Sequence, residues 1–186
     1  LDDVNETASF PPTDPLLADT DGDGVCDGLI AVDPICLAGP DAFPTDPSEW
    51  VDTDGDGIGN NADTDDDNDG LDDVNETSSV PPTDPLLVDT DGDGVCDGSI
   101  AVDLICLAGP DAFPTDPSEW LDTDGDGIGN NADTDDDGDG LDDVIETNTG
   151  IYVDANDTGT DPLLPDTDGD GYCDGPIAVD PICLAG

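Results

Sequence analysis

One pattern, Asp-x-Asp-x-Asp-Gly, constrains this chain more than any other feature because it recurs seven times at regular places. Residues 52–57 spell it DTDGDG, and further copies begin at Asp19, Asp65, Asp89, Asp122, Asp135 and Asp166. Carboxylates at alternate positions converge on one hard cation, and glycine at position 6 permits the sharp turn that this requires. Position 7 then offers a backbone carbonyl, position 9 a side chain or a water, and position 12 a closing carboxylate. The pattern therefore predicts calcium loops.

The loops differ at position 12. In the first loop this position is Ile30, so the closing ligand must come from elsewhere in the chain. The second loop closes with Asp63, and the third closes with Glu76, which completes the full twelve-residue calcium pattern. Leu1, Asp3 and Glu6 occupy positions 7, 9 and 12 of an eighth loop whose start is absent. We expect the metal ligands to be Asp3, Glu6, Asp19, Asp21, Asp23, Val25, Asp27, Asp52, Asp54, Asp56, Ile58, Asn60, Asp63, Asp65, Asp67, Asp69, Leu71, Asp73, Glu76, Asp89, Asp91, Asp93, Val95, Asp97, Asp122, Asp124, Asp126, Ile128, Asn130, Asp133, Asp135, Asp137, Asp139, Leu141, Asp143, Glu146, Asp166, Asp168, Asp170, Tyr172 and Asp174.

The charge balance shows why cations are needed. The chain has 51 acidic residues and no Lys, Arg or His, so its formal net charge is -51. Such a chain repels itself out of any compact state unless cations from solution complete it. The acids sit at fixed loop positions, which a solvated acidic tail or a halophilic surface does not explain. The sign of the charge excludes nucleic acid and anionic membranes as partners.

The apolar residues are too scattered for regular secondary structure. They form short islands such as residues 29–32 and 35–37, and the 23 glycines and 17 prolines interrupt every longer periodic pattern. No apolar run is long enough to cross a membrane. We expect an irregular fold, mostly coil, with short helical turns and β-bridges: a calcium-stabilised tandem-repeat rod in which metal ions replace the core.

Internal repeats set the expected organisation. Residues 1–70 and 71–140 align without a gap and differ at seven positions. We expect repeat unit 1 at 1–70, unit 2 at 71–140, and a partial unit 3 at 141–186 with a seven-residue insertion around residues 151–158. The loop at Asp65 crosses the boundary between units, so calcium is expected to join one unit to the next. Both ends cut through motifs, which suggests a window on a longer repetitive chain.

These loops lack the helices of an EF-hand. Another Gly-rich loop precedes Asp65, and Ser-Ser-Val-Pro-Pro follows shortly after Glu76, so at most residues 71–77 make one or two turns. Bare calcium loops in tandem, with cysteines between them, resemble thrombospondin type 3 repeats, most strongly over residues 52–70. Residues 13–19 and 42–50 look like the bacterial versions. The resemblance implies little regular secondary structure and a chain wrapped around a string of calcium ions, with ligands at the motif positions given above.

The resemblance also implies more than one ion per loop. Two Ca²⁺ in each loop would offset about half of the 51 acids, so we expect closer to two than to one. Asp63 closes one loop two residues before Asp65 opens the next, so neighbouring ions can share carboxylates. Further candidate ligands are Asp2, Asp66, Asp72, Asp136 and Asp142.

The cysteines fall in three equally spaced pairs. Six cysteines allow 15 pairings, but local pairing gives every unit the same bond: Cys26 with Cys36, Cys96 with Cys106, and Cys173 with Cys183. Each bond would contribute about 3 kcal/mol in the chain-entropy model. Zinc ligation and free buried thiols are the alternatives. Disulfides would place the protein outside the cell or on its surface. The regular pair and the near-perfect 70-residue period depart from the thrombospondin type 3 pattern.

The function expected from these features is structural. We expect an extracellular calcium-binding protein, the shaft of a self-assembling fibre made rigid by Ca²⁺ and disulfides, with calcium and copies of itself as partners. The apolar islands would supply contacts between copies. The alternatives are the stalk of a cell-surface adhesin and, further off, a calcium buffer or mineral-nucleating protein. No enzyme is expected, because no His, Lys or Arg can act as a base or bind a substrate.

Overall fold

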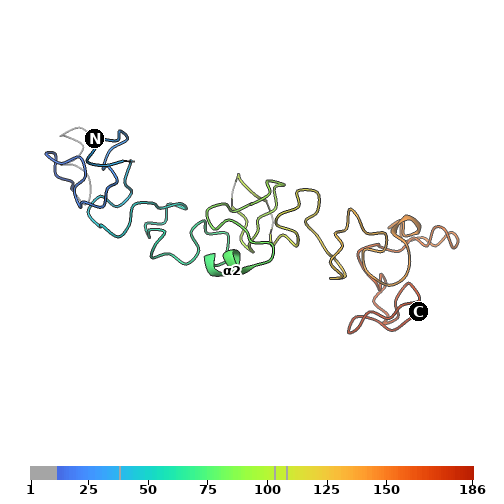
Figure 1. Ribbon diagram of the computed structural model, residues 1–186. Helices are drawn as coiled ribbons and strands as arrows, with labels where there is room; N and C mark the ends of the chain where they lie inside the picture. Colours follow the sequence, from blue (N-terminus) through green and yellow to red (C-terminus); the bar gives the residue numbers. More distant parts are fainter. Residues whose placement is uncertain (1–11, 38, 103, 108) are drawn as a thin grey trace. The chain divides into compact units, whose positions relative to one another are not determined.

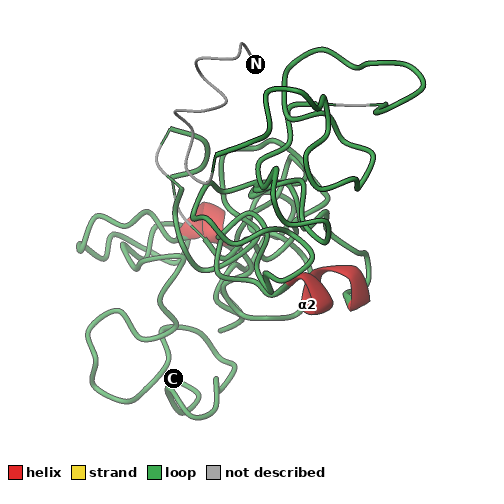
Figure 2. Cartoon of the chain, turned by 90° about the vertical axis from the view of Figure 1, so that its left-hand side faces the viewer, coloured by secondary structure: helices red, strands yellow, loops and turns green. Residues whose placement is uncertain are grey.

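The computed structural model describes residues 12–37, 39–102, 104–107 and 109–186. Within these ranges the backbone consists almost entirely of turns and bends, as Figures 1 and 2 show. The helical elements are the α-helix α2 (Asp73–Ser78) and the 3-10 helix η1 (Asp143–Ile145). Pairing between extended segments is limited, in the described residues, to isolated β-bridges such as that between Val32 and Cys36. The expected coil-rich, irregular fold is confirmed.

Helix α2 is short because its flanks cannot extend it. Asp73 and Glu76 lie in its first turn, where carboxylates interact favourably with the helix N-terminus. The backbone turns to an extended conformation at Ser79, and two prolines follow shortly after. The one or two turns predicted for residues 71–77 are thus present. No helix in the described ranges has the length and apolar character needed to cross a membrane.

The chain forms two compact units. Unit 1 comprises Leu1–Val88 and Gly98–Val102, and unit 2 comprises Asp89–Asp97 and Asp103–Gly186. These compact units divide the chain differently from the 70-residue sequence repeat, because two segments of the second repeat, residues 71–88 and Gly98–Val102, belong with unit 1. The repeat boundaries remain a prediction from the sequence.

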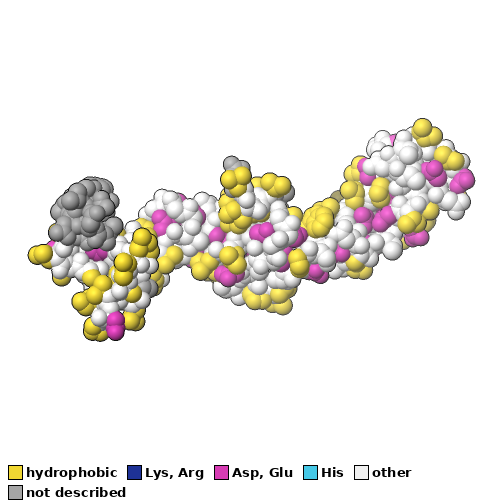
Figure 3. Space-filling model, turned by 90° about the horizontal axis from the view of Figure 1, so that it is seen from above, with side chains coloured by type: hydrophobic (Ala, Val, Ile, Leu, Met, Phe, Trp, Pro, Cys, Tyr) yellow, Lys and Arg dark blue, Asp and Glu magenta, His cyan; other side chains and the backbone are white. Residues whose placement is uncertain are grey.

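Disulfides and carboxylates fill the interior. Among the described residues, the buried hydrophobic side chains are the six cysteines and Val88, whereas Leu16, Leu37 and Leu104 are exposed. Figure 3 shows hydrophobic side chains distributed over the visible surface. The buried acidic residues are Asp27, Asp41, Glu49, Asp66, Asp67, Asp69, Glu76, Asp97, Asp111, Glu119, Asp137, Asp139 and Glu146. Buried charges without basic partners require another source of positive charge.

The cysteines pair locally, as predicted. The bonds join Cys26 to Cys36, Cys96 to Cys106 and Cys173 to Cys183, and none of the six cysteines is free. Zinc ligation and free thiols are therefore wrong for these residues. The segment closed by the first disulfide folds back on its loop, because the Leu37 N–H donates to the carbonyl of Gly24 at 3.0 Å. Three disulfides indicate a non-cytoplasmic protein.

Candidate metal centres

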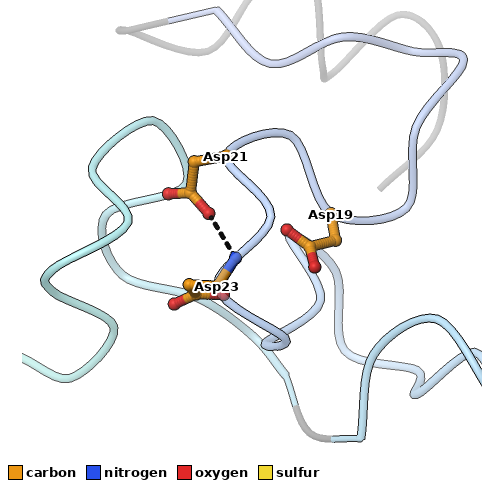
Figure 4. A group of neighbouring side chains, drawn as sticks. All are labelled: Asp19, Asp21 and Asp23. Carbon is orange, nitrogen blue, oxygen red and sulfur yellow. Dashed lines mark hydrogen bonds between the residues drawn. The ribbon is translucent and has the colours of Figure 1, made fainter.

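The aspartates of each loop are held with their carboxylates facing one another. In the first loop, one oxygen from each of Asp19, Asp21 and Asp23 lies within 4.8 Å of the others (Figure 4). The N–H groups of Gly22 and Gly24 donate to the two oxygens of Asp19, at 2.7 and 3.1 Å. Asp21 and Asp23 each accept a bond from the N–H two residues later, at 3.2 and 2.7 Å. The same convergence occurs in the triplets that begin at Asp52, Asp65, Asp89 and Asp122.

Glycine at position 6 makes this loop possible. In all seven loops this glycine has a φ between 91° and 101°, a region in which a side chain is strained. Its N–H donates to the carboxylate at position 1 in every loop. The sharp turn that the sequence pattern predicts is therefore present.

The side chain at position 9 is hydrogen-bonded to position 2 of the same loop. Asp27 accepts hydrogen bonds from the N–H and the hydroxyl of Thr20, at 3.0 and 2.7 Å. The bond from the N–H at position 2 to the side chain at position 9 recurs in all seven loops, whether that residue is Asp or Asn. In the second loop, Asn60 also donates its amide to the Thr53 hydroxyl at 2.8 Å. Position 9 thus braces the loop, and its ligation of metal stays a prediction.

The third loop is more buried than the second. Asp69 and Glu76 are both 0% exposed. One oxygen of Glu76 accepts a hydrogen bond from the Thr83 hydroxyl at 3.2 Å, and the other is buried without a hydrogen bond. Burial, and then the charge of Asp67, raises the pKa of Glu76 to about 8. A cation beside this carboxylate would favour its ionised form.

The loop at Asp135 keeps the same closure despite the insertion. Glu146 accepts a hydrogen bond from the Thr160 hydroxyl at 2.9 Å, and its other oxygen is again buried without one. Burial raises the pKa of Glu146 to about 7. Thr160 can replace Thr83 because the inserted segment turns back, where the Thr158 N–H donates to the carbonyl of Ile145 at 2.9 Å. The extra residues leave the candidate site intact.

Asp69 also attaches its loop to a segment much further along the chain. Its Oδ2 accepts a hydrogen bond from the Gly98 N–H at 2.6 Å, and its carbonyl accepts one from Ile100 at 2.6 Å. Asp139, the counterpart of Asp69 in the second repeat, accepts the same two bonds from Gly175 and Ile177, at 2.5 and 2.7 Å. A Cβ on Gly98 would collide with the Asp69 carboxylate, so this approach requires glycine. A candidate metal ligand is thereby also a structural junction.

The loop at Asp122, the counterpart of the second loop, is more exposed, and Asp133 occupies its position 12. Burial raises the pKa of Asp124 in that loop, and the charge of Asp133 contributes to the rise. The same charge contributes to the raised pKa of Asp135 and Asp136 in the next loop, where burial is the largest cause. This placement suits carboxylates shared between neighbouring ions.

Asp66 and Asp136, expected as additional ligands, also lie near these closing carboxylates. Asp66 is buried, and one of its oxygens has no hydrogen bond. Burial, and then the charges of Asp73 and Asp63, raises the pKa of Asp66. Burial, and then the charges of Asp143 and Asp133, raise the pKa of Asp136 to about 6. Both residues therefore remain candidates for a second ion.

Sequence reasoning missed four buried carboxylates outside the loop pattern: Asp41, Glu49, Asp111 and Glu119. Glu49 accepts a hydrogen bond from the Asn61 N–H at 3.0 Å, beside the neck of the second loop. Asp41 lies beside the first loop, because its N–H donates to the carbonyl of Cys26 at 2.9 Å. Burial, and then the charge of Asp23, raises the pKa of Asp41 to about 6. The available signal in the sequence was the missing carboxylate at position 12 of that loop.

All these candidate ligands offer oxygen atoms. Carboxylate and carbonyl oxygens suit hard cations such as Ca²⁺ and Mg²⁺, so several of the described clusters can hold metal ions. Asp2, Asp3 and Glu6 lie outside the described residues. Neither a family model nor a curated protein matches this chain.

Proposed function

We propose that this is an extracellular calcium-binding structural protein, the repetitive shaft of a self-assembling fibre. The observation that carries the proposal is the burial of carboxylates where most proteins bury aliphatic side chains. Asp69, Glu76 and Asp139 are 0% exposed, and the sequence has no basic side chain that could neutralise them. Bound calcium supplies the missing positive charge, so ion binding and folding are one event.

Calcium is the proposed ion because the loops combine several carboxylates with a backbone carbonyl at position 7. Calcium accepts six to eight oxygen ligands in flexible geometry, whereas magnesium requires a tighter octahedron and keeps several waters. The tandem loops, the irregular backbone and the local disulfides also support membership of the thrombospondin type 3 type of repeat, with about two ions per loop.

The self-assembly part of the proposal rests on exposed apolar side chains. Leu29, Ile30 and Leu37 are exposed around the first disulfide segment, and Trp50 is 41% exposed. Apolar contact and shared calcium are the attractions left to a chain with this charge, because copies of it otherwise repel one another. The partners proposed are therefore calcium and other copies of the chain. We propose no catalytic role.

Chelation tests this function most directly. Small-angle scattering and circular dichroism of the oxidised protein should show a compact chain in millimolar Ca²⁺ and an expanded chain in excess EDTA. Added Mg²⁺ should restore the compact state less well than Ca²⁺. An unchanged scattering profile in excess chelator would contradict the proposal.

An adhesin stalk is the second candidate, since equal repeats also suit a spacer of fixed length. Electron microscopy of native material distinguishes the two. Fibres of indefinite length that dissociate in EDTA support the fibre, whereas discrete particles with a terminal domain support the stalk. A calcium buffer would show ion binding without any calcium-dependent assembly.

A further inference from the structure

The first loop has two carboxylate oxygens without a partner. Oδ2 of Asp21 and Oδ2 of Asp23 are both buried and form no hydrogen bond. The loop supplies no closing carboxylate of its own, because Ile30 at position 12 is exposed and apolar. A cation at this loop would therefore need one more anionic ligand from another part of the chain.

Asp41 is placed to be that ligand. It is 7% exposed, and its N–H donates to the carbonyl of Cys26 at 2.9 Å. Its Oδ1 accepts a hydrogen bond from the Phe43 N–H at 2.7 Å, whereas its Oδ2 is buried without any partner. Burial is the largest cause of the raised pKa of Asp41, and the charges of Asp23 and Asp21 contribute to it. Asp41 thus adds a third buried, unpartnered oxygen, on a residue that is hydrogen-bonded to the first loop through Cys26.

The second copy repeats every part of this arrangement. Oδ2 of Asp91, of Asp93 and of Asp111 are all buried without a hydrogen bond. Asp111 is 7% exposed, and its N–H donates to the carbonyl of Cys96 at 2.9 Å. The charges of Asp93 and Asp91 act on Asp111 as those of their counterparts act on Asp41.

We propose that Asp41 and Asp111 are metal ligands that complete the loops at Asp19 and Asp89, each lying five residues after a disulfide-closed segment. The inference rests on the proposed calcium function and names a ligand within it. Cys26 connects Asp41 to the disulfide. Its carbonyl accepts the hydrogen bond from Asp41, and its sulfur closes the segment that returns to Gly24. Calcium affinity at these two loops therefore depends on the disulfides.

The test measures calcium binding to the whole oxidised chain by isothermal titration and equilibrium dialysis. Asp41→Asn and Asp111→Asn should each weaken one site at least tenfold, and the double variant should weaken two. Asp33→Asn changes an exposed carboxylate inside the first disulfide-closed segment and serves as the matched control, with wild-type binding expected. Replacing Cys26 and Cys36 by Ser should weaken the first of these sites while Asp41 is retained.

The outcomes separate this inference from the proposed function. A wild-type chain that binds no calcium contradicts both. A wild-type chain that binds calcium, with a double variant of unchanged affinity and stoichiometry, overturns only the assignment of Asp41 and Asp111. The single variants keep the test decisive, because the unaltered copy in the same molecule shows that folding is retained.

Discussion

The loops at Asp52 and Asp65 follow one another in the chain and share one pattern, yet they differ in burial. Both hold three carboxylates within 4.8 Å, and both use the same hydrogen bonds from backbone N–H groups. Asp56, at position 5 of the first of these loops, is exposed, whereas Asp69, at the same position of the second, is 0% exposed. The pattern alone therefore does not decide how strongly a loop is built into the fold.

The difference comes from residues outside the twelve-residue loop. Asp69 accepts a hydrogen bond from Gly98, and Glu76 accepts one from Thr83. No residue from so distant a part of the chain bonds Asp56 among the described contacts. Distant segments thus convert a local calcium loop into a structural junction, and the two kinds of loop should respond differently to the same substitution.

Removal of the position-5 carboxylate should give the largest difference. Asp69→Ala removes a candidate ligand and leaves the Gly98 N–H buried without its acceptor. We expect a loss of about 3–5 kcal/mol in the free energy of unfolding, the range found for breaking a buried charged interaction. Asp56→Ala, at an exposed loop, should cost much less. Urea unfolding of the oxidised protein in saturating Ca²⁺ measures both, and equal losses would remove the distinction between the loops.

Filling the close approach at Gly98 should have the next largest effect. Gly98→Ala places a methyl group against the Asp69 carboxylate, so the hydrogen bond from Gly98 to Asp69 must open. Overpacking of this kind costs about 1–3 kcal/mol. The neighbouring exposed Ser99 provides the control, since Ser99→Ala should leave stability within about 0.5 kcal/mol of wild type. A Gly98→Ala variant as stable as Ser99→Ala would show that the hydrogen bond from Gly98 to Asp69 contributes little to stability.

The sequence allowed the loops to be predicted but not their surroundings. Alternating aspartates and the glycine at position 6 dictate the local hydrogen bonds, so the triplets and the coil-rich fold followed from the pattern. The disulfides followed from the repeat, because each unit carries the same pair. The contact between Asp69 and Gly98 could not be predicted, since nothing in a Gly-rich stretch identifies which N–H will meet a carboxylate 29 residues away. Asp41 lay outside the pattern for the same reason.

Neutralising the closing carboxylate should sharpen the comparison through ion binding. Glu76→Gln keeps the shape of a fully buried side chain but removes its charge, so we expect calcium affinity at this loop to fall at least about tenfold. Asp63→Asn should have a smaller effect spread over two sites, because the equivalent Asp133 influences carboxylates in both neighbouring loops. Terbium luminescence titrations with calcium competition measure these affinities. A loss confined to one site in Asp63→Asn would contradict carboxylate sharing.

The smallest expected effect concerns the hydroxyl that positions the closing glutamate. Thr83→Val removes the donor to Glu76, and Thr160→Val removes the donor to Glu146 together with a 2.7 Å contact to the Thr158 hydroxyl. Each change should cost about 1 kcal/mol, a typical value for one hydrogen bond, with the larger loss at Thr160. Thermal unfolding in saturating Ca²⁺ measures both variants. If only Thr160→Val were destabilising, the Thr160 hydroxyl would serve to anchor the inserted segment. The burial of Glu76 would then depend on the contact between Gly98 and Asp69 and not on Thr83.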